Sequence, residues 1–164
     1  MLPLLRSTLA LGALLGLLAW LPGCSIATPL TWTAAPAEQP AELHVSVTHA
    51  VLDPERRSAF DAGTEALFER LPDQPGLLGY SRRKELFGDE AWTMTVWRDE
   101  ASHAAFVRSA PHREAMRAGR AALAGARFVE FTWPRASGKL TWRAALDALS
   151  AVPLQDYRAE PEAR

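Results

Sequence analysis

Apolar and polar side chains alternate along residues 43–51, and this period of two constrains the fold more than any other feature of the chain. Alternation over this length is typical of a β-strand with one buried face. The apolar residues that would share that face are Leu43, Val45, Val47 and Val51. Asp53-Pro54-Glu55 then favours the start of a helix, and Pro72 is placed to end it. The folded part of the chain is therefore expected to begin with a strand and a helix.

The patterns that follow predict two more strands, a second helix and a last strand. Strands are expected over residues 77–87, 91–98 and 125–133, and the second helix starts at Asp99 and breaks at Ala110-Pro111. The short link Gly88-Asp89-Glu90 makes the first two of these strands a hairpin. The order strand, helix, strand, strand, helix, strand predicts an α+β, ferredoxin-like βαββαβ domain over residues 42–134, with a four-stranded antiparallel sheet and two helices on one face.

Large apolar side chains occur on both faces of the predicted sheet. Trp92, Met94 and Val96 point to one side and Trp97 points to the other. Two helices cover only one face, and monomers rarely expose an apolar patch larger than several hundred Å². We therefore expect a homodimer with two-fold symmetry. Residues 135–164 are expected to form a tail and a short amphipathic helix, over residues 139–150, that packs on the domain or on its partner.

The chain opens with Arg6, an apolar run over residues 9–21 and Gly23-Cys24. This order is typical of a secretory signal, and a Cys directly after Gly resembles a bacterial lipoprotein signal. We therefore expect a signal peptide over residues 1–23, a lipid on Cys24, and an extracytoplasmic protein anchored at the cell membrane or the outer membrane. An uncleaved anchor over residues 7–27 and ordinary secretion are the alternatives.

Cysteine content, charge and composition narrow the other possibilities. Cys24 is the only cysteine, so the chain can form neither an internal disulfide nor a thiolate zinc cluster. The formal net charge of -1 at pH 7 argues against a nucleic-acid partner. The run Arg82-Arg83-Lys84 is interpreted as part of a strand whose adjacent side chains alternate between faces. Residues 24–41 are rich in Pro and Ala and are expected to be a linker.

A longer motif occupies the predicted hairpin and the helix after it. Residues 92–100 read WTMTVWRDE, and FVRS at residues 106–109, His112 and Met116 follow. These residues resemble the antibiotic-biosynthesis-monooxygenase-like family of dimeric α+β barrels, and the resemblance covers about residues 43–134. It implies a homodimer whose two sheets face each other, and a small apolar pocket between the sheet and the helices of each subunit.

Characterised relatives in such families include cofactor-free oxygenases of phenolic polyketides and haem-degrading enzymes. The haem-degrading branch uses an Asn, a Trp and a His. This sequence contains no Asn, and Phe106 and Met116 stand where the other two residues would be. The resemblance therefore excludes haem degradation of that type, and it implies a protein without a cofactor.

Cofactor-free oxygenation needs a base that converts the substrate into a carbanion or phenolate, and histidine is the natural base near neutral pH. We predict that His112, beside the helix break, is the catalytic base; capping or bridging the break at Pro111 is its structural alternative. The predicted ligand-pocket residues are Trp97, His103, Phe106, Met116, Tyr80 and His49. His44 is interpreted as structural. The histidines lack the spacing of a metal-binding motif, so no metal site is expected.

Two functions remain open at this point. The first is an exported, membrane-tethered homodimer that binds a small apolar or aromatic molecule and acts as a cofactor-independent monooxygenase. The second is a non-catalytic binding or structural lipoprotein of the same fold. The motif around His112 favours the first, whereas the loss of recognisable catalytic residues and the extracytoplasmic setting favour the second.

Overall fold

The computed structural model describes residues 24–158, so the predicted signal peptide at residues 1–23 lies outside the described part of the chain. The strands are β1 (Ser25–Ala27), β2 (Thr31–Trp32), β3 (Glu42–Leu52), β4 (Leu77–Glu85), β5 (Glu90–Trp97), β6 (Leu123–Pro134) and β7 (Gln155–Asp156). The α-helices are α2 (Arg57–Arg70), α3 (Glu100–Val107), α4 (Ala110–Arg120) and α5 (Trp142–Ser150). Over residues 24–158, no helix is both long enough and apolar enough to cross a bilayer.

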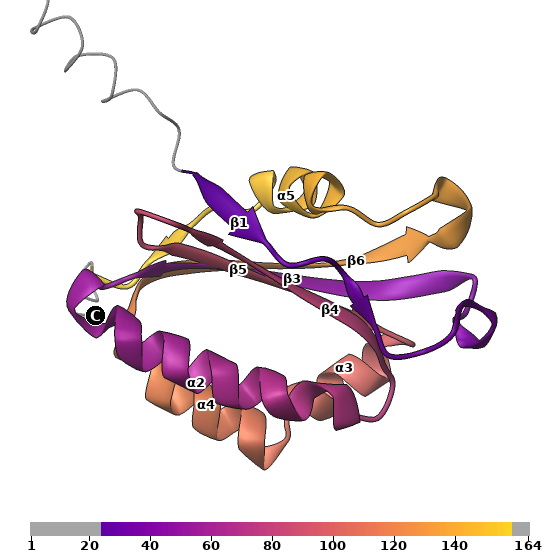
Figure 1. The fold of residues 1–164 in the computed structure, drawn as a ribbon, viewed down its shortest axis with the longest axis horizontal. Helices are drawn as coiled ribbons and strands as arrows, with labels where there is room; N and C mark the ends of the chain where they lie inside the picture. Colours follow the sequence, from indigo (N-terminus) through magenta and orange to yellow (C-terminus); the bar gives the residue numbers. More distant parts are fainter. Residues whose placement is uncertain (1–23, 159–164) are drawn as a thin grey trace, which may run out of the picture.

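The strands form one antiparallel sheet in the order β1-β4-β5-β3-β6-β7, with β2 also paired to β4. Helices α2, α3 and α4 lie on one face of this sheet and α5 lies on the other (Figure 1). The central order β4-β5-β3-β6, with its helices, is the predicted α+β ferredoxin-like arrangement, which is therefore confirmed.

Side-chain caps explain where the second helical segment starts, breaks and resumes. Asp99 caps α3 by accepting a hydrogen bond of 2.7 Å from the N–H of Ser102. Ser109 then caps α4 by accepting a bond of 3.3 Å from the N–H of His112. Pro111 stands in the first turn of α4, where the missing N–H of proline leaves no helical bond unmade. The break predicted at Ala110-Pro111 is thus confirmed, and His112 lies in the first turn of the new helix.

The two faces of the sheet carry side chains of different size. On β3, Leu43, Val45 and Val47 are buried on the side of α5. The alternate residues Ser46 and Thr48 face helices α2 and α4. The same alternation runs along β5, where the large residues Trp92, Met94 and Val96 lie on the α5 side and Thr93 and Thr95 on the helix side. The larger apolar core therefore forms between the sheet and α5.

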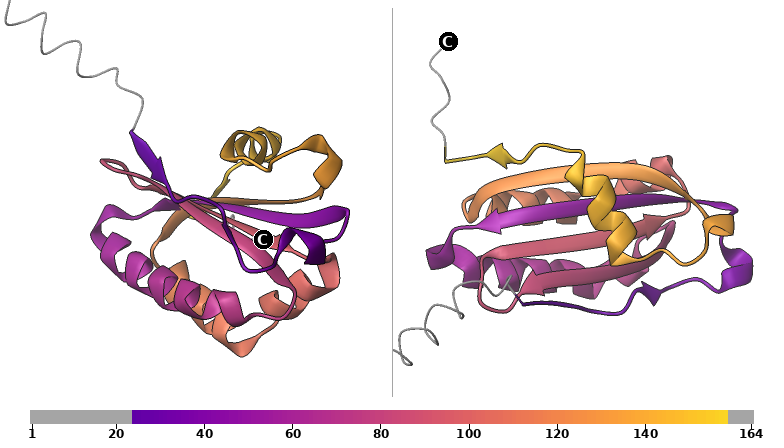
Figure 2. Two further views of the ribbon diagram at one scale, coloured as in Figure 1. Left: turned by 45° about the vertical axis from the view of Figure 1, so that its right-hand side comes forward. Right: turned by 90° about the horizontal axis from the view of Figure 1, so that it is seen from above.

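Helix α5 covers the sheet face that the sequence analysis leaves exposed (Figure 2). Ala145 and Leu149 are fully buried and belong to the same core cluster as the β3 and β5 side chains. The indole N–H of Trp142 donates a 2.9 Å hydrogen bond to the hydroxyl of Ser81 on β4. The predicted amphipathic helix therefore packs on its own domain. This removes the physical reason given for a second copy, since the apolar face is covered within one chain; the homodimer itself stays a prediction.

Residues 24–41 do not behave as the linker that their composition predicts. β1 and β2 pair with the outer edge of β4, and the Thr33 hydroxyl donates a 2.8 Å bond to the carbonyl of Leu77. An open sheet edge offers unpaired backbone groups to any extended segment, so such pairing leaves little mark on composition. The C-terminal tail also joins the sheet, although the sequence predicts only a tail there, because β7 pairs with β6 at residues 155–156.

Replacing Leu149 with Ala should lower the free energy of unfolding by about 2–5 kcal/mol, because the side chain is fully buried between α5 and the sheet. Urea unfolding followed by circular dichroism measures this change. Leu154→Ala, at a half-exposed position, is the control and should change the free energy by less than ~1 kcal/mol. Equal effects for the two variants would show that α5 is not part of the core.

Candidate functional site

A cavity of about 350 Å³ lies between the sheet and helices α2 and α4; we call it the main cavity. Its volume is in the range of small-molecule sites in proteins. Strands β3 and β5 line it with short hydroxyl side chains: Ser46, Thr48, Thr93 and Thr95. The helix side contributes large apolar ones, including Phe60, Leu67, Phe68 and Phe106. The cavity thus combines an apolar wall with a row of hydroxyl groups.

Three of the predicted ligand-pocket residues and the predicted catalytic base line the main cavity. His103 and Phe106 come from α3, and His112 and Met116 come from α4. The side chains of Val107, Met116 and Phe128 also line it and are partly exposed, which gives the cavity an apolar rim open to solvent. The helix break therefore brings both helical segments to one site.

The imidazole of His112 is held in one orientation. Its Nδ1 lies 3.0 Å from the carbonyl oxygen of Val107, and the ring of Phe106 packs edge-on at 4.8 Å between centroids. A carbonyl oxygen only accepts, so Nδ1 carries the proton and Nε2 keeps its lone pair in the neutral ring. Burial lowers the pKa of His112 from its ordinary value of 6.5, although the bond to Val107 acts in the opposite direction. The same bond bridges the helix break, as the structural alternative predicts.

Trp97 and Tyr80 lie next to the main cavity but are not among its lining residues. Trp97 is fully buried, packs on Phe106 at 5.0 Å between centroids, and donates its indole N–H to the hydroxyl of Thr95 at 2.9 Å. Tyr80 packs edge-on against Phe68. These two aromatic residues belong to a small core cluster built around Phe68, Leu71 and Leu77.

His49, also predicted for the pocket, is on the opposite face of the sheet. Its Nε2 donates to the carboxylate of Glu90 at 2.7 Å, and Nδ1 accepts a 3.0 Å bond from Arg127. Trp92 stacks on the ring at 4.8 Å. Because Arg127 can only donate, Nδ1 is unprotonated and His49 is held as a neutral, structural histidine. The alternation along β3 already implied this, since His49 has the same parity as Val47.

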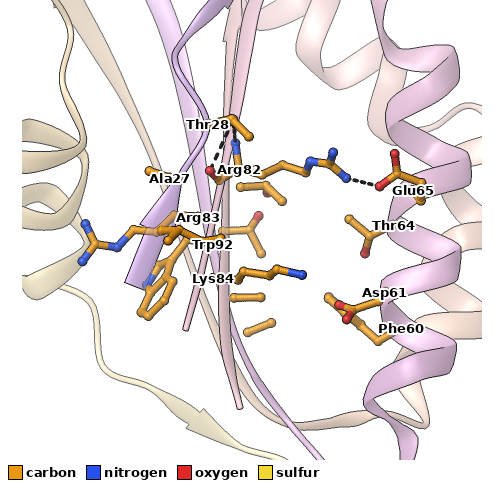
Figure 3. A pocket seen from close by; sticks show the side chains of 15 residues that line it. Ala27, Thr28, Phe60, Asp61, Thr64, Glu65, Arg82, Arg83, Lys84 and Trp92 are labelled. Carbon is orange, nitrogen blue, oxygen red and sulfur yellow. Dashed lines mark hydrogen bonds and ion pairs between the residues drawn. The ribbon is translucent and has the colours of Figure 1, made fainter. Parts of the chain in front are cut away.

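A second cavity, of about 250 Å³, adjoins the main cavity toward β1 and β4 (Figure 3). Arg82 and Lys84 project toward α2, and Arg82 forms an ion pair with Glu65. Arg83 points to the other face and lies over the ring of Trp92. The predicted alternation of this basic run is therefore confirmed.

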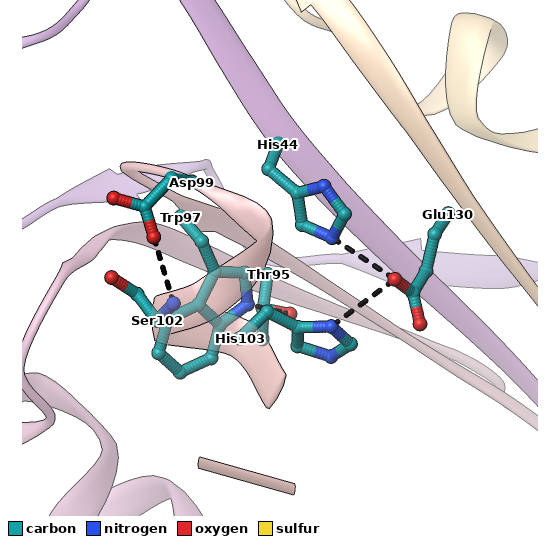
Figure 4. Close-up of polar contacts among 7 residues, drawn as sticks. All are labelled: His44, Thr95, Trp97, Asp99, Ser102, His103 and Glu130. Atoms are coloured by element: carbon teal, nitrogen blue, oxygen red, sulfur yellow. Dashed lines mark hydrogen bonds and ion pairs between the residues drawn. The ribbon is translucent and has the colours of Figure 1, made fainter. Parts of the chain in front are cut away.

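Three polar side chains meet at the α3 end of the main cavity (Figure 4). Nε2 of His44 lies 3.1 Å, and Nδ1 of His103 lies 3.3 Å, from one carboxylate oxygen of Glu130. The side chains of His44 and His103 are 13% and 10% exposed, and that of Glu130 is 49% exposed. Burial lowers the pKa of His103, and Glu130 acts against this. Sequence reasoning missed this cluster because Glu130 follows His44 by 86 positions and only the strand register brings them together.

Comparison with known proteins gives one family and one fold. The family model described as antibiotic biosynthesis monooxygenase matches residues 44–118. No curated protein matches the chain. A solved structure of a candidate monooxygenase from Fusobacterium nucleatum is 12% identical with a TM-score of 0.59; the match covers 82% of this chain and 54% of that one. This chain therefore spans about half the length of that protein.

Two shorter solved proteins show the same likeness. A candidate antibiotic biosynthesis monooxygenase from Bacteroides thetaiotaomicron is 16% identical with a TM-score of 0.53, over 60% of this chain and 95% of that one. Another, from Nitrosomonas europaea, is 14% identical with a TM-score of 0.51, over 54% of this chain and 88% of that one. At these identities the likeness shows a shared fold.

The buried His49 should make the protein less stable as the pH falls. Burial lowers the pKa of His49, and Arg127 adds to this, while Glu90 and Glu85 oppose it. The pKa of His49 in the folded protein is then below the ordinary 6.5. Just below pH 6.5, His49 is therefore protonated in the unfolded chain and still neutral in the folded chain. This contribution to stability is complete above pH 6.5 and is lost as the pH falls below it.

We therefore expect the melting temperature of the wild type to fall between about pH 7.5 and about pH 5.5. In His49→Gln the fall should be smaller, because only the buried His103 and His112 then contribute with the same sign. Differential scanning calorimetry at several pH values measures both slopes. An unchanged or steeper slope in the variant would contradict the assignment to His49.

Proposed function

We propose that this domain, whose residues 44–118 match the antibiotic biosynthesis monooxygenase family model, binds a small apolar or aromatic molecule in the main cavity and oxidises it as a cofactor-independent monooxygenase. His112 carries this proposal. It lines an apolar cavity, its Nδ1 proton is engaged by the Val107 carbonyl, and its Nε2 keeps a lone pair. Because burial lowers the pKa of His112, the ring is a neutral base at pH 7.

The chemistry needs a substrate with an acidic C–H or phenolic O–H group, such as an anthrone or a hydroquinone. For an anthrone, Nε2 of His112 removes a proton from the CH₂ carbon, and the carbanion gives one electron to O₂. The resulting radical pair combines to a peroxide, which takes up the proton and loses water to leave a carbonyl. One oxygen atom ends in the carbonyl and the other in water. The CH₂ carbon supplies all the electrons, so no flavin or redox metal is required.

The lining of the cavity fits such a substrate. The aromatic side chains of Phe60 and Phe106 offer ring surfaces, while the hydroxyls of Ser46, Thr48 and Thr93 on the sheet side offer hydrogen bonds to oxygen substituents. An aromatic ligand would displace water from the apolar wall of the cavity, which slows protonation of the carbanion by solvent.

The second candidate is a non-catalytic binding lipoprotein of the same fold. It is favoured by the hydrogen bond from His112 to Val107, which links α4 to the end of α3. This structural role alone would explain a histidine at this position. In that case the cavity binds its ligand, but the imidazole removes no proton.

We also propose that the chain is exported and tethered to a bacterial membrane by a lipid on Cys24. Cys24 is exposed, and its carbonyl accepts a 2.8 Å bond from the N–H of Leu86 at the tip of the β4–β5 hairpin. At this tip Phe87 is 92% exposed, and Leu86 and Ile26 beside it are half-exposed. An apolar tip next to a lipid anchor would add to membrane binding by entering the bilayer interface.

The tip is held firmly enough to serve as such a contact. Arg57 at the start of α2 donates a 3.0 Å bond to the carbonyl of Glu85 and a 3.4 Å bond to the carboxylate of Asp89. These two bonds brace both sides of the hairpin turn against the helix layer.

A homodimer remains part of the proposal through the family resemblance. Its second copy would meet α5, because α5 lies over the sheet face that two facing sheets would share.

His112→Ala should lower the kcat of oxygen consumption by at least ~100-fold on a panel of anthrones and hydroquinones, because the base is removed. The ligand-induced rise in melting temperature should persist, since the variant keeps the cavity. Arg113→Ala, the exposed neighbour on α4, is the control and should match the wild type. Ligand binding without turnover by the wild type would leave the non-catalytic function, and neither binding nor turnover would exclude both.

The tether predicts a specific pattern of thiol reactivity. Because a lipid would occupy the sulfur of Cys24, the wild type purified from membranes should not react with a maleimide dye, whereas Phe87→Cys should react at its new thiol. In phosphatidylcholine vesicles the dye on residue 87 should report an apolar environment. Ser137→Cys is the control at the opposite, exposed end of the sheet and should report water. A reactive Cys24 would overturn the lipid anchor, and a water-like signal from residue 87 would overturn the apolar contact.

A further inference from the structure

We propose that His44, His103 and Glu130 form a binding site for a divalent transition-metal ion of the Zn²⁺ type. The three possible ligand atoms, one from each side chain, all lie within 4.8 Å of one another. Zinc sits about 2.0–2.2 Å from imidazole nitrogen and carboxylate oxygen, so neighbouring ligand atoms are roughly 3.0–3.5 Å apart. The distances of 3.1 Å and 3.3 Å from Glu130 to the two imidazoles already match this spacing. Two imidazoles and one carboxylate are also a ligand set that such ions prefer.

The fold holds the three side chains in place before any ion binds. In the β3–β6 pairing, His44 lies opposite Thr132 and Ser46 lies opposite Glu130, so His44 and Glu130 are diagonal neighbours on one face of the sheet. His103 is in the first turns of α3, whose start is fixed by the Asp99 cap (Figure 4). Its ring packs 5.5 Å from that of Trp97. Three separate elements therefore converge on one point.

Hydrogen bonding within the cluster shows what an ion would replace. A carboxylate only accepts, so His44 must carry a proton on Nε2 and His103 must carry one on Nδ1 to bond to Glu130. These are the atoms that face one another, and an ion between them would displace both protons. Besides Glu130, the negative charges of Glu100 and Asp99 act on the two histidines, and Arg98 beside Asp99 offsets part of that charge.

The site is open to solvent on one side and to the main cavity on the other. Glu130 is half-exposed, which gives an ion a path of entry. His103 and Glu130 both line the cavity, so a coordination position left free by the three protein ligands would face a bound molecule. A phenolate or carboxylate oxygen of that molecule would suit this free coordination position. This inference goes beyond the proposed function, because no step at His112 passes through the ion, and it replaces the expectation of no metal site.

The test uses the full chain, stripped of metal with a chelator, and needs no substrate. Titration with Co²⁺, whose visible absorption reports its ligands, should show one ion per chain, displaced by Zn²⁺ but not by Mg²⁺. Loss of an outer partner alone weakens metal sites by 10–100-fold, so removal of a ligand in His103→Ala or Glu130→Gln should weaken binding by more than ~100-fold. The matched controls are His112→Ala and Glu114→Gln, which lie outside the cluster and should bind as the wild type does.

Each outcome decides the proposal. Because Glu130 is half-exposed, Glu130→Gln should fold even if His103→Ala does not, and circular dichroism checks both. No Co²⁺ spectrum in the wild type, or equal affinity in the wild type and Glu130→Gln, would overturn the site. Binding that is lost in Cys24→Ala and kept in the cluster variants would assign the ion to the thiol instead. Since the readout is independent of turnover, failure of the monooxygenase proposal leaves this result unaffected.

Discussion

The structure depends on the unequal size of alternate side chains along β3 and β5. Leucine, valine, methionine and tryptophan occupy most positions on the α5 side, while serine and threonine occupy the middle positions on the helix side, and Trp97 lies beyond them next to α3. Burial of large apolar groups drives folding in proportion to the area removed from water, so the tight core forms against α5. The short hydroxyl side chains cannot fill the opposite layer, and the main cavity is the space that they leave.

The larger apolar core lies on the face of the sheet opposite to the one that a fold with two covering helices leads one to expect. In such a fold the helices are expected to bury the apolar face, and the other face then needs a partner. Here the fully buried Ala145 and Leu149 of α5 supply that partner from the same chain. Because α5 stabilises the domain, the layer of α2, α3 and α4 can keep a hollow interior, which a protein that binds small molecules requires.

Local rules predicted much of the fold and the part of the site that α3 and α4 supply. The period of two in residues 43–51 and the caps at Asp53 and Asp99 involve neighbours in sequence, and β3, the 3-10 turn Pro54–Arg56 that leads into α2, and α3 follow from them. The same period puts His49 on the face of Val45 and Val47, opposite the pocket, so the prediction of His49 as a pocket residue conflicts with the strand pattern. By contrast, the pairing of β1 with β4 and the meeting of His44 with Glu130 depend on contacts between distant residues. Backbone pairing and strand register decide such contacts, and neither leaves a periodic signal in the chain.

The helix break between α3 and α4 is what allows one cavity to hold both of its lining histidines. His103 and His112 are nine positions apart, which in an unbroken α-helix of 3.6 residues per turn would set them about 180° apart, on opposite faces. Ser109 and Pro111 end one helix and start the next within this interval, so the second segment turns His112 back toward the sheet. The helix break thus determines which side chains the site contains. Without it, only one of the two imidazoles would reach the cavity.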